Sequence, residues 1–405
     1  MPNQKTLHFA LFLFVAVFCD CSTKKTKTEH TTAANTNLTN LKYTVEEVPA
    51  WISLFKRTSG WYGADGIFAI PLNGIDNVAI SDTSTNLILF SDSMIGEIEN
   101  GKIKGKPHMV HNTVAILKGG EPKNENINFY WDKDDKGEPE TIFIPHLPSA
   151  TKEDYYWLGD GFVNTETNTT YIFAYRMRNM NPKDDWSFRQ MKQDIIAFPN
   201  GTPPPFKNHR QIETRLQFVG ANPGDDGQFG AAIFVNTQYA GAPKPDGYVY
   251  VYGVKGKAKN LIVARVLPKE FEDFSKWNFW DGKNWNADMQ RVAKLTDGVS
   301  NELSLSPLPD GRYVLVFQLN GMSNVVAMRI GASPVGPFGD VIKLYECKES
   351  QENKHYTTYN AKAHPSLSKP GELLITYNVN SMDYLNEIQK NPQLYRPRFI
   401  RLKFE

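Results

Sequence analysis

Residues 60–70 read GWYGADGIFAI, and residues 87–97 read LILFSDSMIGE. Asp65 leads into the apolar end of the first stretch, and the apolar start of the second stretch leads into Asp92. Short runs of β-branched and aromatic residues favour strands, and turn residues precede the second run. This part of the chain therefore predicts one hairpin flanked by two carboxylates, and the rest of the chain repeats the scheme with other residues at the acid positions.

An apolar run introduced by turn residues occurs five times along the chain. The central residues of the runs are 84, 77, 65 and 60 residues apart, which leaves room for four strands with their loops. Another strand candidate precedes each run, and long helices are hard to find. Five such four-stranded units predict an all-β fold, a five-bladed β-propeller, in which closure of the ring protects the sheet edges. Two β-sandwiches are the alternative, but no linker divides the chain. The five runs are 87–90, 171–175, 248–252, 313–317 and 373–377.

The composition argues against a strongly charged partner. The chain has 405 residues, a formal net charge of +1, 29 Gly, 25 Pro and 12% aromatic residues. A nucleic-acid-binding protein would be strongly basic, so a turn-rich β protein with a neutral polar ligand such as a polysaccharide or oligosaccharide is expected.

The amino terminus predicts export. Lys5 and His8 precede an apolar run, residues 9–18, that is too short to span a bilayer. Cys21 is followed by Ser-Thr-Lys-Lys, as in a bacterial lipoprotein, and is the preferred lipidated residue; Cys19 is the alternative, and an ordinary cleaved signal peptide is the other interpretation. Residues 1–21 are thus a signal, residues 22–42 a flexible tether and residues 43–405 the propeller. The prediction is a lipid anchor at the outer membrane or cell surface of a Gram-negative bacterium.

In a propeller, the starts of the innermost strands and the ends of the returning strands meet near the axis. This rule brings together several carboxylates, an Arg, a His and amides. Carboxylates at an aromatic-lined channel suit glycosidic-bond hydrolysis, which needs one protonated and one ionised acid. The candidate catalytic residues are Asp65, Asp92 and Asp160, and the candidate substrate-binding residues are Trp61, Arg176, Glu302, Asn360, His364 and Asn378.

Each candidate also has a purely structural interpretation. Asp65 and Asp160 precede glycines, so either side chain can serve a tight backbone turn. Glu302 can pair with Lys362 or Arg176, and His364 can be a satisfied core residue.

Cofactor motifs for nucleotides, nucleophilic serine hydrolysis or zinc are not visible in the sequence. No cofactor is expected, although a structural Ca²⁺ held by channel carboxylates and amides is an open alternative. Trp277, Trp280 and Trp285 predict either a sugar-stacking platform or a packing cluster.

Four motifs carry a resemblance to a known family. They are residues 60–66 (GWYGADG), 89–96 (LFSDSMIG), 157–161 (WLGDG) and 359–365 (YNAKAHP) followed by 374–380 (LITYNVN). In order and spacing they resemble a group of secreted bacterial five-bladed propellers, long described as a domain of unknown function, part of which includes endo-acting D-arabinanases. The group is similar in architecture to arabinanases, β-xylosidases, invertases and levansucrases.

The resemblance implies a glycoside hydrolase in which the first-blade acid, Asp65, is the base. Asp92 occupies the second acidic position and is the expected partner acid. The wider superfamily often takes its acid from a Glu in the third blade, whereas the third blade of this chain starts at residues 228–230 without one, which leaves Asp160 and Glu302 as competitors. The main hypothesis is an extracytoplasmic glycoside hydrolase acting on a furanose-containing glycan, such as one with arabinofuranose, or on another neutral glycan. The alternative is a non-catalytic glycan-binding lipoprotein.

Overall fold

The structure is a computed structural model that describes residues 37–405 except 182, 184–185 and 222–223. The predicted signal, Cys19, Cys21 and residues 22–36 of the predicted tether lie outside the described residues. Within them, no helix has the length and apolar character needed to cross a membrane. Residues 37–42 lie against the fold, because Arg312 Nη1 donates to the carbonyls of Asn37 at 2.7 Å and Asn40 at 3.0 Å.

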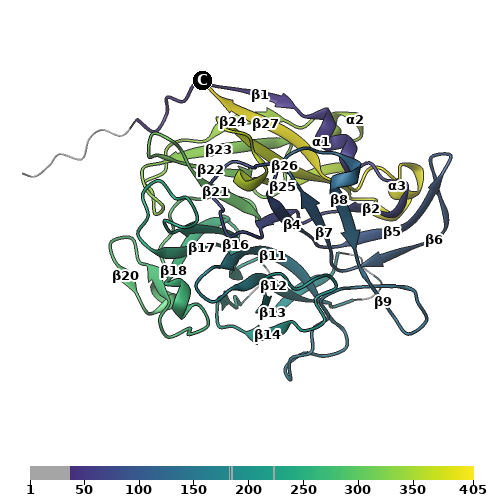
Figure 1. The fold of residues 1–405 in the computed structure, drawn as a ribbon, viewed down its shortest axis with the longest axis horizontal. Helices are drawn as coiled ribbons and strands as arrows, with labels where there is room; N and C mark the ends of the chain where they lie inside the picture. Colours follow the sequence, from purple (N-terminus) through teal and green to yellow (C-terminus); the bar gives the residue numbers. More distant parts are fainter. Residues whose placement is uncertain (1–36, 182, 184–185, 222–223) are drawn as a thin grey trace, which may run out of the picture. The chain divides into compact units, whose positions relative to one another are not determined.

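Five antiparallel sheets of four or more strands follow one another along the described part of the chain (Figure 1). The first contains β3 (Phe68–Pro71), β4 (Thr85–Phe90), β7 (Thr113–Lys118) and β8 (Ile127–Tyr130). The second contains β11 (Asp154–Asn164), β12 (Thr169–Asn179), β13 (Phe188–Pro199) and β14 (Arg210–Glu213). The third contains β15 (Gln217–Phe218), β16 (Gly227–Asn236), β17 (Tyr248–Lys255), β18 (Asn260–Val266), β19 (Asn278–Trp280) and β20 (Trp285–Asn286). The fourth contains β21 (Leu303–Pro307), β22 (Tyr313–Gln318), β23 (Val325–Gly331) and β24 (Ile342–Glu346), and the fifth contains β25 (Tyr356–Ala363), β26 (Glu372–Ser381), β27 (Arg398–Phe404) and β1 (Tyr43–Glu47).

Two smaller sheets and short helices complete the described elements. One sheet joins β2 (Ser59–Ala64), β5 (Ser93–Glu99) and β6 (Lys102–Val110), and the other joins β9 (Asp132–Lys133) and β10 (Pro139–Glu140). The α-helices are α1 (Pro49–Leu54), α2 (Glu349–Glu352) and α3 (Tyr384–Lys390), and the 3₁₀ turns are η1 (Asn124–Asn126), η2 (Pro268–Glu270), η3 (Met289–Arg291) and η4 (Pro365–Leu367).

The innermost strands of the five large sheets form a ring. Strand β11 contacts β3 on one side and β16 on the other, β21 contacts β16 and β25, and η4, which follows β25, contacts β3. The ring is closed by β1, which pairs with β27 from Tyr43↔Phe404 to Glu47↔Ile400 and completes the last sheet (Figure 1). The predicted all-β propeller is confirmed. The count of five blades stays a prediction, for which the five larger sheets give structural support.

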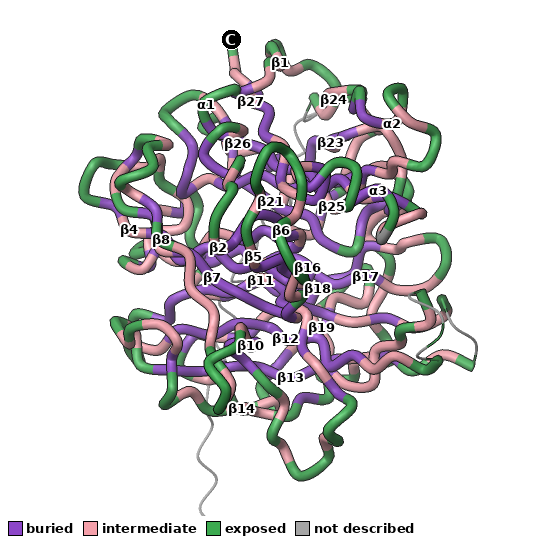
Figure 2. Tube along the Cα trace, turned by 90° about the vertical axis from the view of Figure 1, so that its right-hand side faces the viewer, coloured by how far each residue is buried: buried purple, intermediate pink, exposed green. Residues whose placement is uncertain are grey.

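The apolar core is divided into layers, each of which lies between two neighbouring sheets. One layer joins Leu89 of the first sheet to Ile172 of the second, and another joins Ile88 of the first sheet to Phe399 of the fifth. Comparable layers link the second sheet to the third, the third to the fourth and the fourth to the fifth. Most strand residues are therefore buried on both faces, as the purple strands of Figure 2 show. This explains why the strands read as continuous apolar runs instead of alternating ones.

The predicted hairpin is confirmed, but it is divided between two sheets. Strand β3 pairs with β4 from Phe68↔Leu89, whereas β2 pairs with β5 up to Ala64↔Ser93. Between the two ladders the strands are linked by backbone hydrogen bonds from Ser91 N to Asp65 O (2.9 Å) and from Asp65 N to Asp92 O (3.4 Å). The ribbon bends at this point, and both predicted acids lie at the bend.

Trp61, predicted as a sugar contact, lies in the core. It is 1% exposed and stacks on Phe129 with ring centroids 4.5 Å apart, next to Phe55 and Phe90. The structure thus gives this ring a packing role between the first and fifth sheets.

We expect Trp61→Ala to lower the free energy of unfolding by about 3–5 kcal/mol, because the substitution leaves a large cavity in a dry layer. Urea titration followed by circular dichroism measures this difference. Tyr239→Ala is the matched control, since that ring is 60% exposed, and it should change stability by less than about 0.5 kcal/mol. Equal losses in both variants would contradict the packing role.

Candidate functional site

Four carboxylates form a cluster near the inner strands, and we call them the acid cluster. Asp65 and Glu302 precede β3 and β21, Asp160 lies at the bulge of β11, and Asp92 follows β4. The inner strands β11, β16 and β25 each carry a β-bulge at this level, between Leu158 and Gly161, Phe229 and Ala232, and Tyr359 and Lys362. A bulge re-aims side chains that a regular strand would direct into its neighbours. Asp65 is close enough to Asp92 and Glu302 for their like charges to repel, and Asp160 is close enough to Glu302.

Asp65 lies at the bend between β2 and β3. Tyr359, on the fifth sheet, donates its hydroxyl to Asp65 Oδ2 at 2.7 Å. Burial, together with the negative charge of Asp92, raises the pKa of Asp65 to about 7, although the hydroxyls of Tyr359 and Tyr395 act in the opposite direction. A large fraction of this carboxyl therefore keeps its proton at neutral pH.

The bend depends on Gly66, which follows Asp65. Its φ is +65°, in the left-handed region, and a Cβ at this position would lie 2.6 Å from Ser91 Oγ. Glycine alone meets both conditions without displacing the neighbouring strand. The Asp-Gly pair thus makes a tight turn, as the structural interpretation held, and the same turn presents the carboxylate.

Asp92 has a different environment from Asp65. Its side chain is 21% exposed, and one oxygen, Oδ1, receives the Trp157 indole N–H at 3.0 Å and contacts His111 Nδ1 at 2.9 Å. Both ring nitrogens thus contact the same carboxylate oxygen. The two acids at the bend therefore differ in their partners: hydroxyl groups for Asp65 and ring nitrogens for Asp92.

Asp160 is bound to the backbone of two sheets. Its Oδ1 accepts from Gly161 N at 2.8 Å, and its Oδ2 accepts from Ile233 N of β16 at 2.7 Å. Burial raises the pKa of Asp160 to about 7, against the effect of these two backbone donors. The side chain thus ties the second sheet to the third, and its two oxygens are occupied.

Glu302 pairs with Lys362, as the structural interpretation held. The Lys362 Nζ contacts Glu302 Oε2, and Asn360 Nδ2 donates to Oε1 at 2.8 Å. Burial raises the pKa of Glu302, while the Lys362 ammonium acts in the opposite direction. Lys362 also lies over the Phe68 ring, 4.4 Å from its centroid. Since both members of the ion pair are buried, each is needed to compensate the other.

A small cavity of about 50 Å³ lies beside Asp160, and Asp76, Lys362 and His364 are among the other residues that line it. Burial and the charge of Asp160 raise the pKa of Asp76 to about 8, and its Oδ2 has no hydrogen-bond partner among the described residues. Burial also lowers the pKa of His364 to about 3, and its Nε2 lies 2.7 Å from Thr376 Oγ1. His364 is therefore a neutral, satisfied core histidine.

The structural Ca²⁺ stays a prediction, and the cavity fits it poorly. Calcium takes six to eight oxygen ligands, whereas the Lys362 ammonium lines this cavity and would repel a cation. Among the described residues, no three His, Cys, Asp or Glu side chains form a group that could hold a metal ion.

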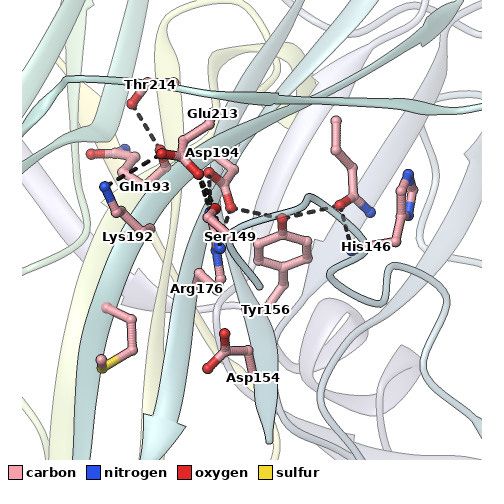
Figure 3. A network of polar contacts seen from close by, with 12 residues as sticks. His146, Ser149, Asp154, Tyr156, Arg176, Lys192, Gln193, Asp194, Glu213 and Thr214 are labelled. Carbon is pink, nitrogen blue, oxygen red and sulfur yellow. Dashed lines mark hydrogen bonds and ion pairs between the residues drawn. The ribbon is translucent and has the colours of Figure 1, made fainter. Parts of the chain in front are cut away.

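Arg176 does not join the acid cluster. It forms a buried network within the second sheet (Figure 3). Its Nε and Nη2 donate to the two oxygens of Asp194 at 2.8 and 3.0 Å, and Nη2 also donates to Glu213 at 3.0 Å. Tyr156 donates to the same Asp194 at 2.7 Å. Because Nη1 donates to Ser149 Oγ at 2.8 Å, all three guanidinium nitrogens have partners within the protein, and the geometry indicates a structural role.

Asn378, the remaining predicted binding residue, is 1% exposed on β26, opposite Tyr359 in the strand register. Neither atom of its amide has a partner among the described residues. Asn360, by contrast, is partly exposed beside Glu302 and has a φ of +57°. Of the predicted binding residues, Asn360 and Glu302 therefore join the acid cluster, whereas Arg176, Trp61 and His364 do not.

The sequence reasoning missed four partners of the acid pair: His111, Trp157, Tyr359 and Tyr395. Trp157 and Tyr359 stand in the WLGDG and YNAKAHP motifs, so their proximity to acids could be suspected. His111 follows β6, in the small additional sheet, and Tyr395 follows α3. No spacing rule for propeller strands reaches these two positions, because both lie in segments added to the repeated units.

Fold and site together define a β-propeller with a carboxylate cluster beside its inner strands. A family model described as "Domain of unknown function (DUF5005)" matches residues 50–404, and the chain belongs to this family. A search of curated proteins gave no match.

Solved structures with similar folds were also found. A protein from Bacteroides ovatus ATCC 8483, described as a "putative hydrolase", has a TM-score of 0.67 at 18% identity, over 88% of this chain and 90% of that chain. A mutant of the GH43 protein BlXynB from Bacillus licheniformis has a TM-score of 0.40 at 11% identity, over 83% and 51% of the two chains. An exo-beta-1,3-galactanase from Phanerochaete chrysosporium has a TM-score of 0.43 at 9% identity, over 85% and 62%. The first of these shows a shared fold.

We expect Arg176→Met to destabilise the protein by about 3–5 kcal/mol, because it leaves the fully buried Asp194 without its cation. Urea unfolding measures the loss of stability. Arg176→Lys, which keeps the charge but not the bidentate hydrogen bonding, should lose less stability. Arg215→Met is the control, since that side chain is exposed. An Arg176→Met protein as stable as the unaltered chain would contradict the structural assignment and return Arg176 to the binding candidates.

Proposed function

We propose that the protein is an exported glycoside hydrolase that cleaves a neutral glycan, with Asp65 and Asp92 as its catalytic pair. One observation carries the proposal: the two carboxylates lie at one bend of one ribbon, bridged by backbone hydrogen bonds, yet have unlike partners. Hydrolysis of a glycosidic bond needs such an unlike pair, one acid to protonate the leaving oxygen and one carboxylate to activate water or attack the sugar.

The environments of the two acids favour a particular division of roles. Asp65 keeps its proton near neutral pH, since burial and the Asp92 charge raise its pKa to about 7. Asp92 is partly exposed and takes two ring nitrogens on one oxygen. We therefore assign Asp65 as general acid and Asp92 as general base or nucleophile, the reverse of the roles that the family resemblance implies.

The rest of the acid cluster supports this pair. Glu302 is compensated by Lys362, and Asp160 is bound by two backbone N–H groups, so neither is free to exchange a proton readily. The negative charge of Glu302 helps to hold the proton on Asp65. Asn360, partly exposed beside Glu302, is the amide of the predicted set that is placed to bind a sugar hydroxyl.

Substrate and location are further parts of the proposal. The near-neutral charge of the chain and the carboxylates of the site favour a neutral glycan over an acidic one. An arabinofuranose-containing glycan follows from the resemblance, and a lipid anchor at Cys21 follows from the amino-terminal sequence. The protein from Bacteroides ovatus, which shares the fold, carries the description "putative hydrolase".

A non-catalytic glycan-binding protein is the second candidate. The propeller fold supports binding and catalysis alike, because function belongs to the site and not to the fold. Release of new reducing ends distinguishes the two functions, since a binding protein releases none.

We expect Asp65→Asn and Asp92→Asn to slow hydrolysis of the polysaccharide that the unaltered protein cleaves by about 10²–10⁴-fold, because each substitution removes one half of the acid–base pair. Reducing-sugar release from arabinan, arabinogalactan, galactan, mannan and xylan measures the effect, and circular dichroism checks the fold. Asp135→Asn, at an exposed position, is the matched control. Near-normal turnover by either site variant would overturn the assignment.

The division of roles has its own readout. If Asp65 is the general acid, Asp65→Ala should lose much less of its bond-cleavage rate on an aryl glycoside whose leaving group needs no protonation than on the polysaccharide, whereas Asp92→Ala should lose activity on both. The opposite dependence on the leaving group would restore the roles that the resemblance implies.

A pH profile tests Asp65 as the acid. Because its protonated form is required, kcat/KM should fall as the pH rises through about 7. The Tyr359 hydrogen bond lowers the pKa of Asp65, so Tyr359→Phe should move this basic limb to higher pH. A limb that stays in place, or moves to lower pH, would contradict Asp65 as the titrating group.

A further inference from the structure

The two faces of the second sheet differ in chemistry. On one face lie Tyr156, Arg176 and Asp194, which belong to the network of Figure 3, and Asp154, which pairs with Arg178. The alternate residues of β11, Tyr155 and Trp157, point to the opposite face, because successive side chains of a strand alternate.

This second face carries a row of rings beside the acid pair; we call His111, Tyr155, Trp157 and Phe188 the aromatic ledge. His111 stacks on Tyr155 with centroids 3.8 Å apart, and Tyr155 meets Trp157 edge-on at 6.0 Å. Trp157 in turn meets Phe188 at 4.8 Å. The outer member, Phe188, is 37% exposed, and Trp186 next to it is 40% exposed.

The ledge is continuous with Asp92. The Trp157 indole N–H and His111 Nδ1 both contact Asp92 Oδ1, at 3.0 and 2.9 Å, so the two inner rings are fixed by the carboxylate itself. The rings present partly exposed apolar surface, and the inner ones carry polar edges, a combination that matches a sugar, with its C–H faces and its rim of hydroxyls.

The carboxylates beside the aromatic ledge restrict the class of ligand that it can bind. Asp92 and Asp65 stand at the inner end of the ledge, so an anionic chain would meet repulsion there. The surface therefore suits a neutral ligand.

We propose that the aromatic ledge is a binding subsite for a neutral glycan chain, which it holds by stacking so that the next sugar lies against Asp92. This inference rests on the proposed function, and it adds the direction in which the chain leaves the acid pair, along Tyr155 and Trp157 toward Phe188. Of the three tryptophans for which the sequence predicts either a sugar-stacking platform or a packing cluster, Trp277 is 1% exposed and packs in the core. Trp280 and Trp285 are partly buried, and a sugar contact by them stays a prediction.

The test measures binding separately from hydrolysis. Affinity gel electrophoresis of the full chain carrying Asp65→Asn uses arabinan, arabinogalactan, galactan, mannan and xylan as neutral probes and polygalacturonate as the acidic one. Phe188→Ala and Tyr155→Ala, added singly, should each weaken binding of the retained neutral polysaccharide about tenfold, the effect of losing one well-packed ring. Tyr239→Ala, which removes an exposed ring outside the ledge, is the matched control and should leave retention unchanged.

The outcomes separate the ledge from the hydrolase. If the unaltered chain releases reducing ends but both ledge variants bind like their parent, the proposed subsite is wrong and the proposed hydrolase activity is supported. If the ledge variants lose binding and the unaltered chain releases no reducing ends, the proposed subsite is supported and the proposed hydrolase activity is wrong. Retention by polygalacturonate equal to that by the neutral probes, or no retention by any neutral probe, would overturn the ledge as a neutral-glycan subsite.

Discussion

Closure of the ring is the constraint on which the site depends. Strand β1 completes the sheet of β25, β26 and β27, so the first and last parts of the domain are held in one ladder. The layer between the first and fifth sheets then packs Ile88 against Leu374 and Phe399. Through this junction Tyr359 reaches Asp65, which is 294 residues away in sequence, and the inner strands of the other sheets bring Asp160 and Glu302 to the same level. An open sheet of the same strands would leave these acids apart.

Closure also creates an electrostatic problem, because it concentrates like charges in partly buried surroundings. The structure compensates each carboxylate differently: Glu302 by a buried ammonium, Asp160 by two backbone N–H groups, Asp92 by exposure and two ring nitrogens, and Asp65 by tyrosine hydroxyls and a raised pKa. This inequality among neighbouring acids is the property that acid–base chemistry uses. A cluster formed only for stability would gain more from compensating all four alike.

The added segments give the propeller its particular surface. Strands β2, β5 and β6 continue the first hairpin past the bend and bring His111 beside Asp92. The second sheet then places Tyr155 and Trp157 next to that histidine, while its other face is committed to the Arg176 network. A single sheet thus serves stability on one face and the proposed ligand contact on the other, because alternate residues of one strand face opposite ways.

Strand and turn preferences act within a few residues and the repeats set the spacing, so the sequence alone predicts the strand runs, the turns, the propeller class and the positions of Asp65, Asp92, Asp160 and Glu302. It does not predict that Arg176, Trp61 and His364 are internal, since burial depends on what the neighbouring sheet places against each side chain. The raised pKa of Asp65 and the rings that border the site follow from the folded structure, because they depend on burial and on partners that are distant in sequence. His111 and Trp157, which contact Asp92, are 19 and 65 residues from it, Tyr359 is 294 residues from Asp65, and no local pattern encodes such contacts.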